Sequence, residues 1–290
     1  GQTKLDKWNE ESEAKKIIEN NIYGVDVNPE SVAVTKLALF LKIASSGKRL
    51  IELTKNIKVG NSLISDKSID KMAFDWELEF PQIFFNTDGD RLENSGFDVV
   101  IGNPPYGRVT DSKDVEYYRQ KFELGSNDLY GMFMKHSFDL LKNDGEFSMI
   151  VSDTWRTITT CRPLREFLLK FKFNRFIKLS RYAVKAPGEN LDVFTIILEF
   201  EKTPPNGSSY TYYDFWGVYP LKEMEFFTNI MNHTKYTKEK DSWEFEIKRT
   251  QRYKVKQELI SKCEWLPVFD GSEKLFMFLD KDAPKSEVEI

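Results

Sequence analysis

The chain alternates short apolar runs with longer segments whose apolar residues recur at helical spacing. The apolar runs predict strands at residues 22–27, 57–60, 97–102, 146–152, 174–180 and 193–200. The amphipathic segments predict helices at residues 9–20, 29–46, 114–124, 129–142 and 162–173. Strands that alternate with helices in this way predict an α/β fold with a mostly parallel sheet and helices on both of its faces.

The start of the second helix carries the strongest local signal. Asn28, Pro29 and Glu30 supply a capping side chain, a residue suited to the first helical position and an acid in the first turn. The helix should end near Gly47, because glycine commonly follows a helix C-terminus. The strand before this helix must stop by Asn28, which leaves Asp26 at its carboxyl end.

The stretch at residues 202–209 is rich in proline and serine and predicts a linker or a hairpin turn. It divides the chain into a core at residues 1–201 and an extension at residues 210–290 that is aromatic and charged without firm periodicity. A core of this length can bury a sizeable apolar interior.

The composition is that of a globular protein in a reducing compartment. It is 40% hydrophobic and 30% charged, and it has no apolar run of the ~18 residues that a membrane span needs. No signal peptide is evident at residues 1–4, so we expect a cytoplasmic protein without membrane partners. Cys161 and Cys263 cannot form a disulfide framework or a zinc site, and His136 lies far from His233, which argues against a metal centre.

Charge is unevenly distributed along the chain, although the net charge of −4 does not indicate a nucleic-acid partner. Residues 66–98 hold nine acids and three bases. Residues 155–185 hold nine bases and one acid, a net charge of +8. Like charges repel one another unless an anion is near, so this segment predicts an outward-facing surface for phosphate, with a solvated helix face as the alternative. Its phenylalanines have helical spacing and are expected to pack in the core: Phe167, Phe171, Phe173 and Phe176.

Three predicted strand ends carry polar residues suited to ligand binding. Asp26 follows the first strand, where an acid can accept hydrogen bonds from ribose hydroxyls. Asn61 and Ser62 follow the second, and Asn103-Pro104-Pro105-Tyr106 follows the third. Because the carboxyl ends of neighbouring parallel strands meet at one sheet edge, we expect Asp26, Asn61 and Asn103 together there. A helix cap, a plain turn and an ordinary strand exit are the alternative interpretations.

The third strand end is chemically the most specific. Its two prolines remove two backbone N–H donors and fix φ, so the loop is stiff while its carbonyls stay free to accept hydrogen bonds. The Asn103 side-chain oxygen and the Pro104 carbonyl then form a rigid pair of acceptors beside the Tyr106 ring. Such a loop can hold a planar group that bears an NH2.

Together, the three strand ends resemble motifs II, III and IV of the gamma-class N6-adenine DNA methyltransferases. The stretches 127–133, 145–151 and 193–200 resemble motifs V, VI and VIII of that family. The sequence FDWELEFPQIF at residues 74–84 is similar to the large single-chain methylases of type IIG restriction–modification and BREX phage-defence systems. The resemblance covers residues 13–201 and implies a Rossmann-like fold for S-adenosylmethionine-dependent methyl transfer.

The resemblance implies that the first two strand ends bind S-adenosylmethionine. Asp26 would hold its ribose, and Val27 would lie against its adenine ring. Asn61, with Ser62 beside it, would meet the adenine amino group, although the family often has aspartate at this position. The family's motif I, a glycine-rich loop about one helix before Asp26, has no match in residues 1–21. We therefore expect an N-terminally truncated core that binds the cofactor weakly by itself and methylates nothing.

The resemblance also implies that the third strand end binds the target base. Asn103 and the Pro104 carbonyl, in a loop stiffened by Pro105, would accept both hydrogens of the adenine N6 amine. Tyr106 would stack on the adenine after it has flipped out of the duplex.

Double-stranded DNA is the implied partner. Arg156, Arg162 and Lys185 would neutralise phosphates beside the flipped nucleotide, and their contacts would weaken with salt. Tyr182 is the nearest candidate for the second aromatic residue that the family places near motif VIII. The family further implies a DNA-recognition domain after residue 209, and specificity or nuclease domains outside this chain.

Two other functions stay open beside an adenine N6 DNA methyltransferase of a restriction–modification or phage-defence system. A release-factor glutamine methyltransferase shares the Asn-Pro-Pro-Tyr motif, but it lacks the basic, aromatic stretch after motif VI. A non-catalytic DNA-binding fragment would account for the absent motif I.

Overall fold

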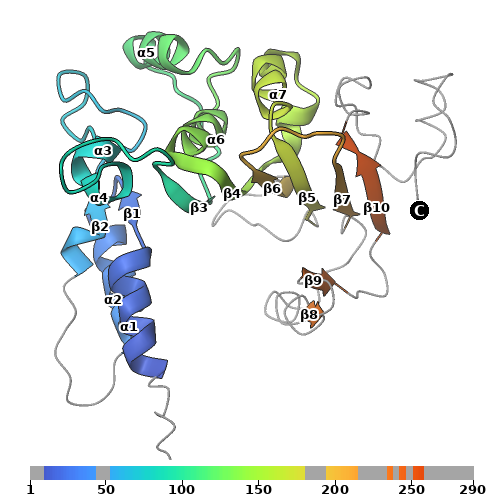
Figure 1. The fold of residues 1–290 in the computed structure, drawn as a ribbon. Coiled ribbons are helices and arrows are strands. Elements are labelled where there is room, and N and C mark those ends of the chain that lie inside the picture. Colours follow the sequence, from blue (N-terminus) through green and yellow to red (C-terminus); the bar gives the residue numbers. More distant parts are fainter. Residues whose placement is uncertain are drawn as a thin grey trace, which may run out of the picture. The chain divides into compact units, whose positions relative to one another are not determined.

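The computed structural model describes residues 10–43, 53–179, 194–214, 234–237, 242–245 and 251–257. The chain forms two compact units, Gly1–Glu93 and Asn94–Ile290. Both units combine helices with parallel strands (Figure 1). Among the described residues, no helix has both the length and the apolar character needed to cross a membrane.

The first unit opens as a strand–helix–strand arrangement. α1 (Glu10–Asn21) leads into β1 (Gly24–Asp26), α2 (Pro29–Ile43), a 3-10 turn (Leu53–Lys55) and β2 (Ile57–Val59). The two strands pair in parallel, with Asp26 opposite Val59. The core of this part is small and apolar, and consists of Ile18, Val32, Leu53 and Ile57.

The predicted start of α2 is confirmed. Asn28 Oδ1 accepts a hydrogen bond from the Glu30 N–H at 2.8 Å, and Pro29 is the first helical residue. Asn28 is therefore the cap, and the alternative in which Asp26 caps this helix does not hold. Asp26 Oδ1 instead accepts the Asn28 N–H at 2.7 Å, which ties the end of the strand to the start of the helix.

An aromatic cluster closes the first unit. Phe80 is fully buried between α3 (Trp76–Glu79) and α4 (Pro81–Phe84), and its ring centroid lies 5.7 Å from that of Phe74. A Cβ at Gly60 would lie 2.7 Å from a carbon of the Phe74 ring, closer than carbon atoms can approach. Glycine at position 60 therefore lets the chain pass that ring just before Asn61.

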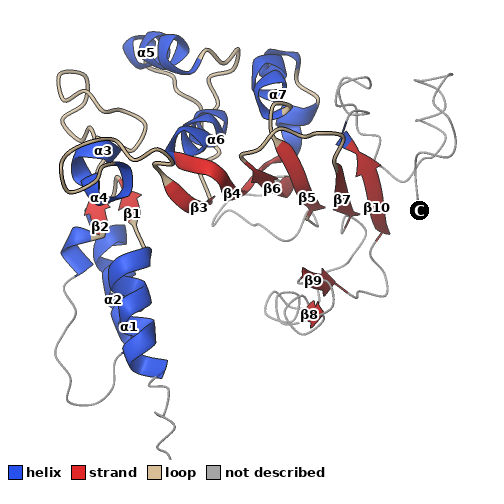
Figure 2. Cartoon of the chain, in the orientation of Figure 1, coloured by secondary structure: helices blue, strands red, loops and turns tan. Residues whose placement is uncertain are grey.

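The second unit is built on a six-stranded sheet in the order β10-β7-β5-β6-β4-β3 (Figure 2). Its strands are β3 (Phe97–Gly102), β4 (Leu141–Ser152), β5 (Lys172–Lys178), β6 (Thr195–Glu201), β7 (Ser209–Asp214) and β10 (Gln251–Lys256). β3, β4, β5 and β7 point the same way, whereas β6 and β10 are reversed. The predicted α/β class is confirmed, and the sheet is mixed with most strands in one direction. A separate antiparallel pair joins β8 (Thr234–Thr237) to β9 (Ser242–Phe245).

The described partner of β3 is β4, which runs parallel to it. Parallel strands need a long crossover, and α5 (Ser112–Phe122) with α6 (Leu129–Leu140) supplies it between these two strands. The expected parallel pairing is confirmed for β1 and β2, while β3 belongs to the six-stranded sheet of the second unit.

Helices cover one face of the six-stranded sheet in the described residues (Figure 1). The Phe138 ring of α6 stacks on Phe147 of β4, with centroids 5.1 Å apart, and on Phe171 at 4.2 Å. On the opposite face, Val99 and Ile101 of β3 are 54% and 76% exposed. The expectation of helices on both faces is thus not met within the described part of this unit.

Several predicted boundaries shift. α6 ends at Leu140 and β4 begins at once, and β4 bulges between Leu141 and Glu146, which pair with Phe97 and Val99; the left-handed φ of +62° at Asp144 lies in this bulge. α7 (Arg162–Leu168) is shorter than predicted, since β5 already begins at Lys172. Residues 202–208 connect β6 to β7, which pairs with β5 in the same sheet. The predicted boundary at residue 201 is therefore no boundary of the sheet, and the two compact units divide after Glu93.

Candidate functional site

The loop after β3 presents the predicted acceptor cluster at the surface. Asn103 is exposed, Pro104 is buried and Tyr106 is half-buried. The Tyr106 hydroxyl donates a hydrogen bond of 3.3 Å to Asn103 Oδ1. Burial raises the pKa of Tyr106, so its hydroxyl stays protonated and remains a donor at neutral pH. The ring and the amide of this loop are therefore held close to each other.

The chain beyond Tyr106 is anchored to the segment that starts α6. Gly107 O accepts the Leu129 N–H at 3.0 Å, and Arg108 forms an isolated antiparallel bridge with Asp128. Arg108 Nε also lies 3.1 Å from Asp128 Oδ1. Asp128 stands at the cap position of α6, but its carboxylate binds Arg108 and the Ser126 hydroxyl and makes no cap hydrogen bond.

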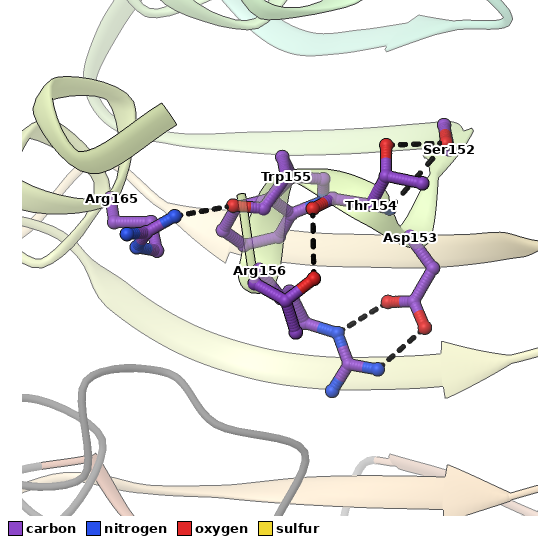
Figure 3. Close-up of polar contacts among 7 residues, drawn as sticks. Ser152, Asp153, Thr154, Trp155, Arg156 and Arg165 are labelled. Carbon is purple, nitrogen blue, oxygen red and sulfur yellow. Dashed lines mark hydrogen bonds and ion pairs between the residues drawn. The ribbon is translucent and has the colours of Figure 1, made fainter. Parts of the chain in front are cut away.

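The carboxyl end of β4 lies at the same sheet edge, because Gly102 pairs in parallel with Met149. The chain turns there into a 3-10 helix at Asp153–Arg156 (Figure 3). The Ser152 hydroxyl oxygen accepts the Thr154 N–H at 3.4 Å and lies 2.9 Å from the Thr154 hydroxyl. Two strand ends with polar loops, Asn103–Tyr106 and Ser152–Thr154, are thus brought together.

Arg156 is buried in this turn. It is 3% exposed, and both Asp153 carboxylate oxygens accept hydrogen bonds from its guanidinium (Figure 3). Burial alone would lower the pKa of Arg156, but the adjacent Asp153 carboxylate, together with Tyr212 and Tyr210, outweighs burial and raises that pKa above its ordinary value. The expectation that Arg156 faces outward toward DNA phosphates is wrong, because its charge is satisfied inside the fold.

Arg165 secures the same turn from α7. Its Nη1 donates hydrogen bonds of 2.7 Å to the carbonyls of Trp155 and Ile158, and Arg165 is 7% exposed (Figure 3). Arg165, a second base of residues 155–185, is therefore also buried and stabilises this turn. Trp155 is fully buried beside it.

Two further bases of this segment are paired with acids on a neighbouring strand. Lys172 pairs with Glu201 at 2.6 Å and Arg175 pairs with Glu199, both acids being on the neighbouring strand β6. Three of the nine bases, Arg156, Lys172 and Arg175, are thus paired with acids from outside the segment, which lowers the charge that it can present to solvent. The four phenylalanines pack as predicted: Phe173 and Phe176 are fully buried, and Phe167 and Phe171 contact Phe138.

Of the residues predicted to contact DNA, Arg162 lies at the surface. Its side chain is 74% exposed, and its Nε lies 2.9 Å from Glu166 Oε1 one turn away. Lys185 and Tyr182 lie outside the described residues.

The first unit brings the two predicted cofactor strand ends together. Asp26 and Val59 are opposite each other, and the Gly60 N–H donates to Asp26 O at 2.9 Å, so Asn61 directly follows the paired strands. Asp26 is exposed, and Val27 beside it is an apolar side chain that is 58% exposed. Ser62 is half-buried in the next position.

The backbone and the side chain of Asn61 both form hydrogen bonds with the loop that begins at this residue. Its backbone N–H donates to Met72 O at 2.6 Å, and its Nδ2 donates to Asp70 Oδ2 at 2.8 Å. Its Oδ1 accepts the Leu63 N–H at 3.2 Å. The side-chain amide therefore has a defined orientation.

The sequence patterns did not indicate the contact of Asp70 with Asn61 or the contact of Asp128 with Arg108. Asp70 is one of nine acids between residues 66 and 98, and nothing local distinguishes it from the others. Its contact with Asn61 depends on how a loop of nine residues closes. Asp128 has the local pattern of a helix cap, and only the bridge to Arg108 reveals its other partner.

Solved structures of restriction–modification enzymes share this fold. A nuclease-deletion mutant of the Type ISP enzyme LlaGI, in complex with a DNA substrate mimic, has a TM-score of 0.50 at 13% identity, over 71% of this chain and 19% of that one. A DrdV–DNA complex has a TM-score of 0.50 at 15% identity, over 80% of this chain and 24% of that one. These likenesses establish the fold.

The family profile that matches this chain is that of a methylase, and the α/β fold agrees with it. The chain belongs to the Eco57I restriction-modification methylase family, whose sequence profile matches residues 20–184, more than half of the 290 residues.

Named relatives of this family are much longer than the chain. It is 27% identical over 210 residues to the type II restriction enzyme and methyltransferase RM.Eco57I of Escherichia coli, across 67% of this chain and 20% of that protein. It is 32% identical over 95 residues to the adenine-specific methyltransferase BrxX of Escherichia coli O9:H4 (strain HS), across 32% of this chain and 8% of that protein. The chain thus spans a fifth or less of the length of these relatives.

Proposed function

We propose that the full-length protein transfers a methyl group from S-adenosylmethionine to adenine N6 at a specific DNA sequence, within a restriction–modification or phage-defence system. The Asn103–Tyr106 loop carries this proposal, since it sets two acceptor oxygens and an aromatic ring at the end of β3. Family membership supports it, because relatives of this chain bear the names of a restriction enzyme and methyltransferase and of an adenine-specific methyltransferase.

The proposed reaction does not depend on a titratable side chain. Asn103 Oδ1 and the Pro104 carbonyl would accept the two hydrogens of the amine and stabilise the positive charge that develops on nitrogen. This is electrostatic stabilisation by fixed dipoles, so no general base has to act before attack. The Tyr106 ring would stack on the adenine, which must leave the duplex because base stacking hides its amine.

The residues of the first unit fit the adenosine part of the cofactor. Asp26 offers an exposed carboxylate to a ribose diol, and Val27 offers an exposed apolar side chain to a flat ring. Asn61 Oδ1 offers an amide oxygen to the ring's amino group. When bound, S-adenosylmethionine supplies an electrophilic methyl group on a positively charged sulfur.

Substitution of Tyr106 separates stacking from hydrogen bonding. Tyr106→Ala removes the ring and should weaken capture of the flipped base severely. Tyr106→Phe removes one exposed hydrogen bond to Asn103, worth about 0.5–1.5 kcal/mol, so the rate should fall by less than about tenfold. The fluorescence of 2-aminopurine at the target position would report base capture. Equal losses in both variants would contradict the stacking role and assign the function to the hydroxyl.

DNA binding should involve Arg162 and Lys185, with Tyr182 near the flipped base. Arg162→Glu should weaken binding to every sequence and reduce the slope of log affinity against log salt by about one for each phosphate that is no longer neutralised. Breaking its exposed pair with Glu166 costs little. Lys170→Glu, two residues beyond the C-terminal end of α7, is the control and should have a smaller effect. Unchanged affinity of Arg162→Glu at low salt would remove Arg162 from the proposed DNA-binding surface.

The product distinguishes the candidate functions. The purified full-length protein should transfer the methyl group to DNA, and nucleoside mass spectrometry of the digested DNA should show N6-methyladenine. Methyl transfer to a glutamine of a release factor, with unmodified DNA, would instead favour the protein methyltransferase.

A further inference from the structure

We propose that Asp70 is a positioning residue that fixes the Asn61 side-chain amide with its oxygen available to the amino group of the bound cofactor's adenine. This inference rests on the proposed function. The juxtaposition that carries it is the hydrogen bond of 2.8 Å from Asn61 Nδ2 to Asp70 Oδ2.

The carboxylate of Asp70 and the Leu63 N–H both favour one orientation of the Asn61 amide. The two ends of an asparagine amide have nearly the same shape, but one is a donor and the other an acceptor. An ionised carboxylate only accepts hydrogen bonds, so the group that faces Asp70 must be the NH2 of Asn61. The oxygen Oδ1 is then turned away from Asp70.

The oxygen retains capacity for a ligand. Asn61 Oδ1 accepts the Leu63 N–H at 3.2 Å, which uses one of its two lone pairs. The remaining lone pair suits an amine hydrogen and repels a carbonyl oxygen. The site should therefore prefer a 6-amino purine to a 6-oxo purine.

Both carboxylate oxygens of Asp70 take part in this arrangement. Asp70 Oδ1 accepts the Met72 N–H at 2.8 Å, while Oδ2 accepts from Asn61. Both acceptors are in use, so the position needs two oxygens. An asparagine at position 70 has only one, and the Met72 N–H would claim it. Its NH2 group would then face the NH2 of Asn61, and the amide would be held by the Leu63 N–H without the carboxylate, so that its oxygen would face the ligand less often.

The chain offers a closely matched control. Asp66 Oδ1 accepts the Ser68 N–H at 2.7 Å, in the same kind of turn as Asp70 with Met72. Asp66 lies in the same loop and has the same charge, and its side chain is exposed. The described contacts join Asp70, and not Asp66, to Asn61. Replacement of either acid changes the loop charge equally, while only one replacement should act on the amide.

The test measures the affinity of the full-length protein for S-adenosylhomocysteine and for S-inosylhomocysteine by calorimetry. The wild-type protein should prefer the 6-amino compound by about tenfold or more. Asp70→Asn should reduce that preference at least about tenfold, mainly through weaker binding of the 6-amino compound. Asp66→Asn should leave both affinities within about twofold of wild type.

A second pair of variants keeps the inference testable if Asp70→Asn folds poorly. Asn61→Asp sets two carboxylates against each other and should bind S-adenosylhomocysteine poorly. Adding Asp70→Asn to it restores a donor and acceptor pair, and should recover at least about tenfold in affinity.

Three results would overturn the inference: no preference for the 6-amino compound in the wild type, an equal loss for both ligands in Asp70→Asn, or no recovery in the exchanged pair. An equal loss of affinity for both ligands would mean that Asp70 only stabilises the loop and does not orient the amide. Methyl transfer to DNA by the wild-type protein would leave the proposed function standing in each case. A wild-type protein that binds cofactor selectively but does not modify DNA would instead refute the proposed function.

Discussion

Replacing Asn103 by alanine is expected to lower the rate of methyl transfer about 100-fold or more in the full-length protein. In the proposed mechanism, the substitution removes one of two fixed acceptors for the amine, whose nitrogen develops positive charge. Loss of one such preorganised partner costs about 3 kcal/mol of transition-state stabilisation. Single-turnover kinetics with saturating DNA would isolate the chemical step.

The matched variant is Asn103→Asp, which keeps an acceptor oxygen at the same place and should retain more of the rate than Asn103→Ala. Tyr106 can still donate its hydroxyl hydrogen bond to that oxygen, as it does to Asn103. A rate for Asn103→Ala within tenfold of wild type would show that this side chain does not hold the reacting amine.

Replacing Asp153 by alanine is expected to destabilise the second unit by about 3–5 kcal/mol. The change leaves the guanidinium of Arg156, which is 3% exposed, without its carboxylate partner. An unpaired charge in this environment is costly because neither water nor a counter-charge solvates it. Urea unfolding followed by tryptophan fluorescence would measure the effect, since the indole of Trp155 is fully buried in the same turn.

Two variants sharpen this prediction. Glu166→Ala breaks the exposed pair with Arg162 and should cost less than about 0.5 kcal/mol. Asp153→Leu combined with Arg156→Met removes both charges and should be at least about 2 kcal/mol more stable than Asp153→Ala. If Asp153→Ala lowers the free energy of unfolding no more than Glu166→Ala does, Arg156 does not need the Asp153 carboxylate as a buried partner.

Features that depend on a few consecutive residues could be predicted from the sequence. The α2 start follows from Asn28, Pro29 and Glu30, whose capping chemistry is local. The parallel pairing of β1 with β2, and with it the closeness of Asp26 to Asn61, follows from the order of strand, helix and strand.

Features that depend on strand pairing or loop closure could not be predicted from the sequence. The segment 155–185 looked strongly basic because a count along the chain omits Asp153, Glu199 and Glu201, which pair in the fold with three of its nine bases. β7 and β10 join the main sheet although no periodicity in the extension indicated it, since their pairing joins residues about forty positions apart. The Asp70 contact was equally hidden, because loop closure decides which acid meets Asn61.

The central claim is that this chain is part of an enzyme that methylates adenine N6 in DNA through Asn103. Single-molecule methylation sequencing of the host tests it most directly, in the intact strain, in a strain without the gene, and in a strain whose only copy carries Asn103→Ala. We predict N6-methyladenine at one sequence motif in the intact strain and its loss in both others. A methylation pattern that is identical in all three strains would contradict the claim.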